Sequence, residues 1–186
     1  MTSADLFHRV RNALEHAHVP YMLTGSIASS IHGTPRATHD VDIVIAPDRD
    51  SLSVLLDSFS ESEYYVSREA ALAALSSEGQ FNVIDFTTGW KIDFIIRKST
   101  PFGRDAFARR ITMELEGIPL SIASAEDVLV SKLDWARRAP SERQLDDVAG
   151  IILEQGASLD TAYVEHWVTL LGLTFQWNAA KARAIE

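Results

Sequence analysis

Residues 21–47, YMLTGSIASSIHGTPRATHDVDIVIAP, contain the pattern that decides the fold of this chain. Their apolar and polar residues predict a short strand, a break at Gly25-Ser26, a short helix, a loop and a second strand. The helix is expected to stop at Gly33 and Pro35, because glycine and proline end regular structure. The predicted ranges are 21–24 for the first strand, 26–32 for the helix and 41–46 for the second strand.

Two acidic residues, Asp40 and Asp42, lie at the start of the second strand. Their side chains point to the same face, because strand residues i and i+2 share a face. The apolar run VDIVIA predicts a buried strand, where two neighbouring carboxylates are destabilising unless a cation or hydrogen bonds neutralise them. Mg²⁺ is usually held by one or two carboxylates together with substrate phosphates. The pair therefore predicts a magnesium site.

The composition of the 186 residues is that of an ordinary globular domain, with 46% hydrophobic and 23% charged residues. No apolar run approaches the roughly 18 residues that cross a membrane, and the N-terminus lacks a signal-peptide pattern, so no membrane partner is expected. The chain contains no cysteine, which excludes disulfides and thiolate metal sites and fits a cytoplasmic location. Its net charge of −9 disfavours a broad nucleic-acid footprint.

The pattern of the whole chain predicts an α+β protein in two parts. Residues 1–122 form an α/β core, and residues 123–186 form a helical portion that packs on it. Ser124 begins a capping-box sequence at the start of the helical portion, and Ser158 is the expected cap of a later helix. The predicted helices include 4–18, 68–76, 102–110, 124–138 and 141–154, and the predicted hairpins cover 81–97 and 111–122.

A third acidic residue is needed to complete a metal site with Asp40 and Asp42. Asp93 lies within KIDFII, where a lone carboxylate in a buried strand is unfavourable unless it is paired or binds a metal. Asp85, within FNVIDF on the other strand of the same hairpin, is a rival on the same argument. We favour Asp93 because its flanking residues are more continuously apolar, and Asp85 remains an open alternative.

The Gly25-Ser26 break is a candidate phosphate site. Glycine allows the backbone to approach a phosphate closely, and the following helix presents free N–H groups to an anion. The simpler interpretation is a turn with a helix cap. Arg36 could equally be a surface charge, and Lys132 would ordinarily lie on the solvated face of its helix.

Together these motifs resemble the nucleotidyltransferase superfamily, whose signature is a Gly-Gly or Gly-Ser pair, a spacer, Asp-x-Asp and a distant third acid. Residues 25–45 and 123–151 look more closely like bacterial proteins grouped with the AbiEii/AbiGii-type toxins, and the likeness covers roughly residues 5–172. The spacer is at the long end of the family range, and Gly25-Ser26 replaces the doubled glycine of many members. The resemblance implies a polymerase-beta-like fold, with a small mixed sheet flanked by helices and followed by a C-terminal helical half.

The resemblance also implies a mechanism with two Mg²⁺ ions. Asp40 and Asp42 would hold both ions, and Asp93 would complete the site that activates the acceptor hydroxyl. The three aspartates are thus the expected metal-binding and catalytic residues.

Five further residues are implied to bind the nucleoside triphosphate. By analogy with the family, Gly25 and Ser26 would bind its β- and γ-phosphates, and Lys132 would reach the triphosphate from a helix. Arg36 and Thr38 match the Arg-x-Thr-x-Asp pattern of the subgroup and would order the loop beside the metals.

Two classes of function follow. The first is an Mg²⁺-dependent transferase that moves a nucleotide from a triphosphate such as ATP to an RNA end, with tRNA as the acceptor in toxin relatives, to a protein hydroxyl or to a small molecule. Such an enzyme could be the toxin of a toxin–antitoxin pair, with a cognate antitoxin as partner. The alternative is a non-catalytic nucleotide-binding or antitoxin-like interaction protein. All three acids are present, which favours the enzyme.

Overall fold

The computed structural model describes residues 3–139 and 141–185, which form two compact units. The first unit contains the described residues up to Thr24 together with Thr38–Ile122. The second contains Gly25–Ala37 together with the described residues from Ala123 onward. The second unit therefore includes residues 25–37 from the first half of the sequence. The division into domains 1–122 and 123–186 stays a prediction.

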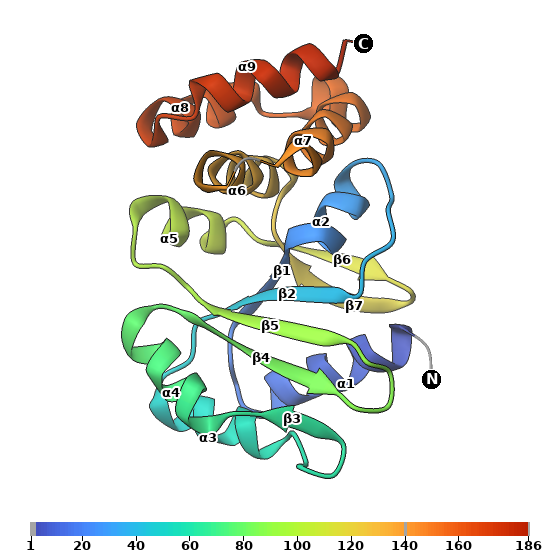
Figure 1. The fold of residues 1–186 in the computed structure, drawn as a ribbon, viewed down its shortest axis with the longest axis vertical. Helices are drawn as coiled ribbons and strands as arrows, with labels where there is room; N and C mark the ends of the chain where they lie inside the picture. Colours follow the sequence, from blue (N-terminus) through green and yellow to red (C-terminus); the bar gives the residue numbers. More distant parts are fainter. Residues whose placement is uncertain (1–2, 140, 186) are drawn as a thin grey trace. The chain divides into compact units, whose positions relative to one another are not determined.

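The first unit is built on a seven-stranded mixed sheet with the strand order β3-β4-β5-β2-β1-β7-β6 (Figure 1). Strand β2 pairs with β5, and β1 with β7, in parallel, whereas the other neighbouring strands are antiparallel. This arrangement places β2 and β5 side by side in the middle of the sheet. The strands are β1 Tyr21–Thr24, β2 Asp40–Ile45, β3 Tyr64–Val66, β4 Gln80–Asp85, β5 Lys91–Ile96, β6 Ile111–Leu115 and β7 Ile118–Ile122.

The helices of the first unit begin at side-chain caps where the sequence provides them. Asp48 forms a capping box with Ser51 at the start of α3, and Thr100 caps α5 just before Pro101. Helix α1 packs against α3 and β7, and α4 packs against β4. These helices cover apolar residues of the strands. The helices are α1 Ser3–His16, α3 Arg49–Asp57, α4 Arg68–Ser77 and α5 Pro101–Ala108.

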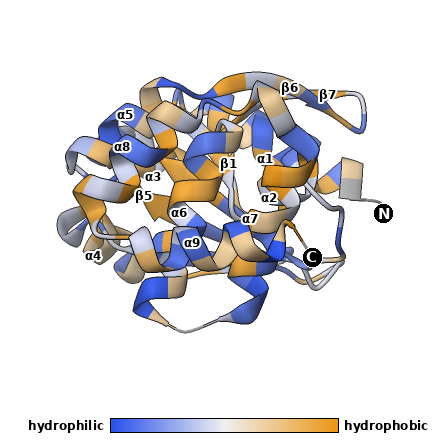
Figure 2. Cartoon of the chain, turned by 90° about the horizontal axis from the view of Figure 1, so that it is seen from above, coloured by the Kyte–Doolittle hydropathy of each residue, from blue (hydrophilic) through white to orange (hydrophobic). Residues whose placement is uncertain are grey.

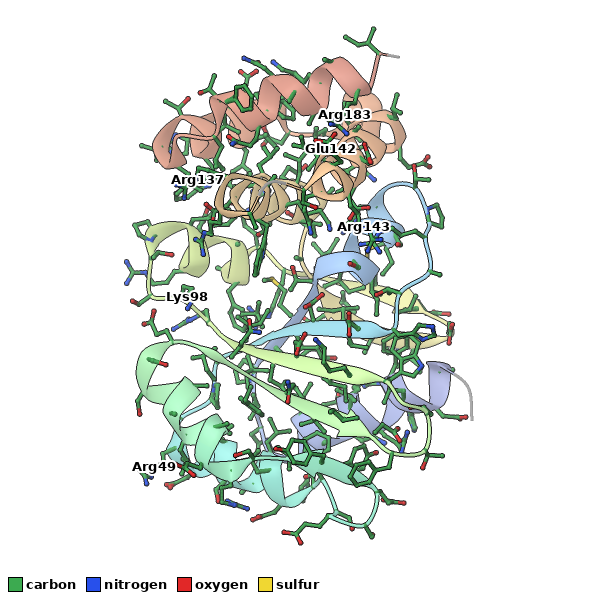
Figure 3. All side chains as sticks on the ribbon, viewed as in Figure 1. Arg49, Lys98, Arg137, Glu142, Arg143 and Arg183 are labelled. Atoms are coloured by element: carbon green, nitrogen blue, oxygen red, sulfur yellow. The ribbon has the colours of Figure 1, made fainter. Side chains whose placement is uncertain are left out.

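The second unit is helical, and α6 is its central helix because it packs against α2, α7, α8 and α9. Figure 2 shows hydrophobic and hydrophilic residues alternating along α7 and α9, as expected for helices with one buried face. Arg183 near the end of α9 pairs with Glu142 and Asp146 of α7 (Figure 3). The helices are α2 Gly25–His32, α6 Ala125–Arg138, α7 Glu142–Gln155, α8 Thr161–Leu171 and α9 Thr174–Arg183, with a short 3₁₀ turn, η1 Gly156–Ser158.

Most predicted elements are confirmed, and three details are wrong. Strand β2 is buried on one face only, since Val41, Ile43 and Ile45 are buried while the Asp40 face is exposed or half-buried. The cap of α8 is Asp160, because Ser158 is taken up by the preceding 3₁₀ turn. Strand β3 was not predicted, since a three-residue strand gives too short a pattern. Among the described residues, no helix has the length and apolarity to cross a membrane.

Candidate functional site

The acidic cluster of the first unit is assembled by the parallel pairing of β2 with β5. In this register Asp42 is the Cα partner of Asp93, and Asp40 is the partner of Lys91. Asp40 and Asp42 share one face of β2, because the alternate residues Val41 and Ile43 are buried on the other. The predicted third acid, Asp93, is therefore on the strand next to the predicted pair.

Asp93 is buried, as predicted, and its charge is compensated by a lysine of the same strand. The Lys91 ammonium lies 2.9 Å from Asp93 Oδ2 and 3.6 Å from Asp40 Oδ1. The hydrogen bond to Asp93 is the main reason that the pKa of Lys91 is raised, and it outweighs the opposing effect of burial. Lys91 was not among the predicted site residues, although its spacing of two from Asp93 places both on one face of β5.

The donor set of this acidic cluster fits a hard divalent cation. Carboxylate oxygens are the ligands that Mg²⁺ prefers. The Lys91 ammonium contacts both Asp40 and Asp93, so the oxygens of these two acids can approach one cation together. Among the described residues 3–139 and 141–185, no three histidine or acidic residues form a group that could hold a metal ion. Mg²⁺ usually retains water and substrate phosphate ligands, so a complete protein cage is not required.

Asp85, the alternative third acid, makes contacts that stabilise the fold. Its Cα partner on the neighbouring strand β3 is Tyr64. The side chain is fully buried, pairs with Arg9 of α1, and accepts hydrogen bonds from the backbone amides of Thr87 and Thr88. Burial alone would raise the pKa of Asp85, but these hydrogen bonds together with the Arg9 charge lower it. Asp85 thus fixes the β4–β5 turn and ties it to α1.

Asp85 and Asp93 are expected to respond differently to amide substitution. Asp85→Asn should lower the free energy of unfolding by about 1 to 3 kcal/mol, because Arg9 loses its charged partner, and leave turnover per folded molecule nearly unchanged. Asp93→Asn should remove activity at a smaller cost in stability. Urea unfolding followed by turnover assays on the folded fraction checks both. If Asp85→Asn is fully folded and yet loses turnover, Asp85 belongs to the functional site.

Thr38 precedes the acidic cluster and fixes the backbone that enters β2. Its hydroxyl accepts a hydrogen bond from the Asp40 amide at 3.2 Å, so the loop is tied at the residue that carries the first acid. This contact fits the expected loop-ordering role of Thr38.

Gly25, Ser26 and Arg36 belong to the second unit. Gly25 has a φ of 65°, a backbone conformation that glycine adopts without strain, and it begins α2 directly after β1. The Ser26 hydroxyl accepts a hydrogen bond from Arg36 Nη2. Within this unit Arg36 is thus held next to the start of α2.

Asp147 of α7 links Arg36 to Lys132. Its carboxylate accepts two hydrogen bonds from the Arg36 guanidinium, at 2.9 and 3.1 Å, and one from Lys132 Nζ at 2.6 Å. Lys132 also donates to Gln144 at 3.1 Å. The three charged side chains form one network that contains Arg36 and Lys132, two of the five residues predicted to bind the nucleotide. We call Arg36, Lys132 and Asp147 the charged triad.

The charged triad depends on close packing between the loop after α2 and helix α7. A Cβ atom on Gly33 would lie 2.7 Å from the backbone nitrogen of Ile151, and one on Gly150 would lie 2.8 Å from Thr34 Oγ1. The Gly33 contact is with rigid backbone, so glycine is needed there, whereas a side chain at position 150 would require Thr34 to shift. The spacing of Gly150 three residues after Asp147 is the sequence signal that could have indicated this packing.

Sequence comparisons identify no relative of this chain: no family model matches it, and neither does any curated protein. Its fold, in contrast, matches solved structures over nearly the whole chain. The crystal structure of ANT(2")-Ia in complex with adenylyl-2"-tobramycin has a TM-score of 0.60 and 14% identity, covering 98% of this chain and 99% of that one.

Two further structures share the fold. The lincosamide antibiotic adenylyltransferase LnuA, bound to lincomycin, has a TM-score of 0.56 at 14% identity and covers 81% of this chain and 96% of its own. An antigenic nucleotidyltransferase-like protein from Paracoccidioides brasiliensis has a TM-score of 0.51 at 19% identity, covering 96% and 94%. The chain therefore has the nucleotidyltransferase fold, a mixed sheet flanked by helices and followed by a C-terminal helical half.

Proposed function

We propose that this protein transfers a nucleoside monophosphate from a nucleoside triphosphate to an acceptor hydroxyl and releases pyrophosphate. The acceptor oxygen forms a bond to the α-phosphorus, the bond from that phosphorus to the pyrophosphate oxygen breaks, and the hydroxyl proton passes to solvent water. The observation that supports the proposal best is the register of β2 with β5, which pairs Asp42 with Asp93 and leaves Asp40 on the face of Asp42. The shared fold agrees with it.

The three aspartates are proposed to hold two Mg²⁺ ions. When bound, Mg²⁺ supplies charge neutralisation at the phosphate oxygens and lowers the pKa of the acceptor hydroxyl. Asp40 and Asp42 would orient both ions from β2, and Asp93 would hold the ion on the acceptor side. Thr38 fixes the backbone of Asp40 and so contributes to the orientation of its carboxylate.

The phosphate-binding role of Gly25, Ser26 and Lys132 is proposed from the sequence motif, and a nucleotide-binding role of Arg36 from its contacts in the second unit. Arg36 and Lys132 are cations that suit a triphosphate, and Gly25 with Ser26 starts a helix whose N–H groups suit an anion. Asp147 would act as a positioning residue, because it contacts both cations and no reacting group.

The acceptor is proposed to be small or proteinaceous rather than a large RNA. A net charge of −9 opposes a broad phosphate footprint and favours a cationic acceptor. The structures of ANT(2")-Ia and LnuA contain an adenylylated aminoglycoside and a lincosamide, respectively, so a hydroxyl-bearing small molecule is a reasonable first choice. A tRNA acceptor is tested by the labelling experiment below, whereas a toxin role with a cognate antitoxin and a cytoplasmic location are proposed from the sequence alone.

A non-catalytic nucleotide-binding protein is the second candidate. The observation that favours it is the Lys91 ammonium on Asp93 and Asp40, which occupies oxygens that a catalytic metal would need. Such a protein would bind a triphosphate and transfer nothing.

One labelling experiment separates the candidates. Purified protein with Mg²⁺ is incubated with each α-³²P-labelled triphosphate and, in separate reactions, with total RNA, a protein extract, an aminoglycoside and a lincosamide. We expect label on one acceptor class with one preferred triphosphate. Triphosphate binding without label on any acceptor would reject the transferase in favour of the binding protein.

A further inference from the structure

Lys91 is a cation in direct contact with two of the proposed metal ligands of the first unit. It lies two residues before Asp93 on β5 and is the Cα partner of Asp40 on β2. Its ammonium contacts one carboxylate from each strand, at 2.9 Å for Asp93 and 3.6 Å for Asp40. The Lys91 side chain is 40% exposed, whereas that of Asp93 is 11% exposed, so the lysine covers a nearly buried acid from the solvent side.

The contact provides electrostatic compensation inside the protein. Neighbouring carboxylates on two paired strands repel one another, and the Lys91 ammonium offsets this repulsion at Asp93 and Asp40. A lysine is well suited to such a reversible role, because its ammonium is a point charge on a flexible stem. The long stem allows Lys91 to leave Asp93 without any movement of the strand.

A divalent cation bound to Asp93 would compete with the Lys91 ammonium for the negative charge of this carboxylate. Mg²⁺ binds carboxylate oxygens at about 2.0 to 2.1 Å, which would bring two positive centres close together around one oxygen. Their repulsion favours departure of the ammonium.

We infer that Lys91 is a built-in counter-ion that neutralises Asp93 and Asp40 in the metal-free protein and is displaced when a divalent cation binds. The inference rests on the metal site of the proposed function and adds a regulatory element to it. The lysine lowers the affinity for free metal, so the site stays neutralised until a metal is supplied at sufficient concentration or together with a nucleotide. It also protects the metal-free fold from the repulsion of three acids.

The first test measures Mn²⁺ binding by electron paramagnetic resonance and calorimetry, without nucleotide or acceptor. Lys91→Met should bind Mn²⁺ about tenfold or more tightly than the wild type, because competition and repulsion are removed. Lys91→Arg, which keeps the charge, should stay close to the wild type. Lys98→Met is the matched control, since Lys98 is an exposed lysine of the same unit whose ammonium bonds to the Glu78 carbonyl (Figure 3); its affinity should change less than about twofold.

The second test uses the wild-type protein, so it does not depend on the folding of a variant. Lysine acetylation by a small reagent, read by mass spectrometry, should proceed several times faster at Lys91 when Mn²⁺ is present, while Lys98 should not respond. Equal or weaker Mn²⁺ binding in Lys91→Met, or unchanged acetylation of Lys91, would overturn the inference. Tighter Mn²⁺ binding in Lys91→Met with no label transfer by the wild type would retain the inference and reject the proposed function. Label transfer by the wild type, with no tighter Mn²⁺ binding in Lys91→Met, would support the proposed function and reject the inference.

Discussion

Asp42→Asn is expected to reduce nucleotidyl transfer by about 10³-fold or more while the protein remains folded. Asp42 is central among the three acids, because it shares the face of Asp40 and is the Cα partner of Asp93. The amide keeps the volume of the side chain and removes the charge that is proposed to bind a divalent cation. Turnover with the labelled triphosphate and the acceptor identified in the labelling experiment measures the loss.

The control is an equal change of charge elsewhere in the first unit. Glu61→Gln alters an exposed residue of a turn and should keep at least about half of the wild-type rate, since surface substitutions have small effects. Circular dichroism and the thermal midpoint establish that both variants are folded. If Asp42→Asn retains more than about a tenth of the activity with Mg²⁺, a catalytic metal role for this acid is untenable.

The local elements of this chain were predictable because the sequence patterns that encode them are short and regular. Strand β1, the Gly25 break and helix α2 follow from an apolar run, a glycine and helical spacing. Asp40 and Asp42 were identified as a pair because a strand places alternate residues on one face.

Lys91 was missed because its role depends on strand register. Its contact with Asp40 exists only because β2 and β5 are parallel neighbours with Asp40 opposite Lys91. Parallel strands are joined through a long crossover connection, so no local signal specifies which residues are opposite. The choice between Asp85 and Asp93 depended on the same information, since both acids are in strands of one hairpin and only their neighbours differ.

The charged triad was missed for a related reason. Lys132 was read as a residue of a solvated helix face, yet it is 3% exposed, because helices α6 and α7 pack together and bury it beside Asp147. The pattern of a single helix does not reveal that two oppositely charged residues on different helices will be buried together. A buried pair of this kind is destabilising when one partner is removed, which makes the triad testable.

Asp147→Ala is expected to destabilise the second unit by about 3 to 5 kcal/mol, because it leaves the buried Lys132 ammonium and the Arg36 guanidinium without their shared carboxylate. The Asp147 side chain is 7% exposed and that of Lys132 is 4% exposed, so water can replace little of the lost interaction. Urea unfolding measures the loss. Asp146→Ala is the matched control, because the adjacent Asp146 is exposed and pairs with Arg183 at the surface. Its effect should stay below about 1 kcal/mol.

The pH dependence of stability provides the second arm of this prediction. Burial alone would raise the pKa of Asp147, but hydrogen bonds and charges from Arg36 and Lys132 outweigh burial and lower it. A lowered pKa gives stability that is present above the unfolded value of about 3.9 and is lost as the pH falls through the folded value. The difference in unfolding free energy between wild type and Asp147→Asn should therefore be largest near neutral pH and should shrink below about pH 4. A difference that is constant from pH 7 to pH 3 would mean that Asp147 stabilises the unit by packing, with no contribution from its charge.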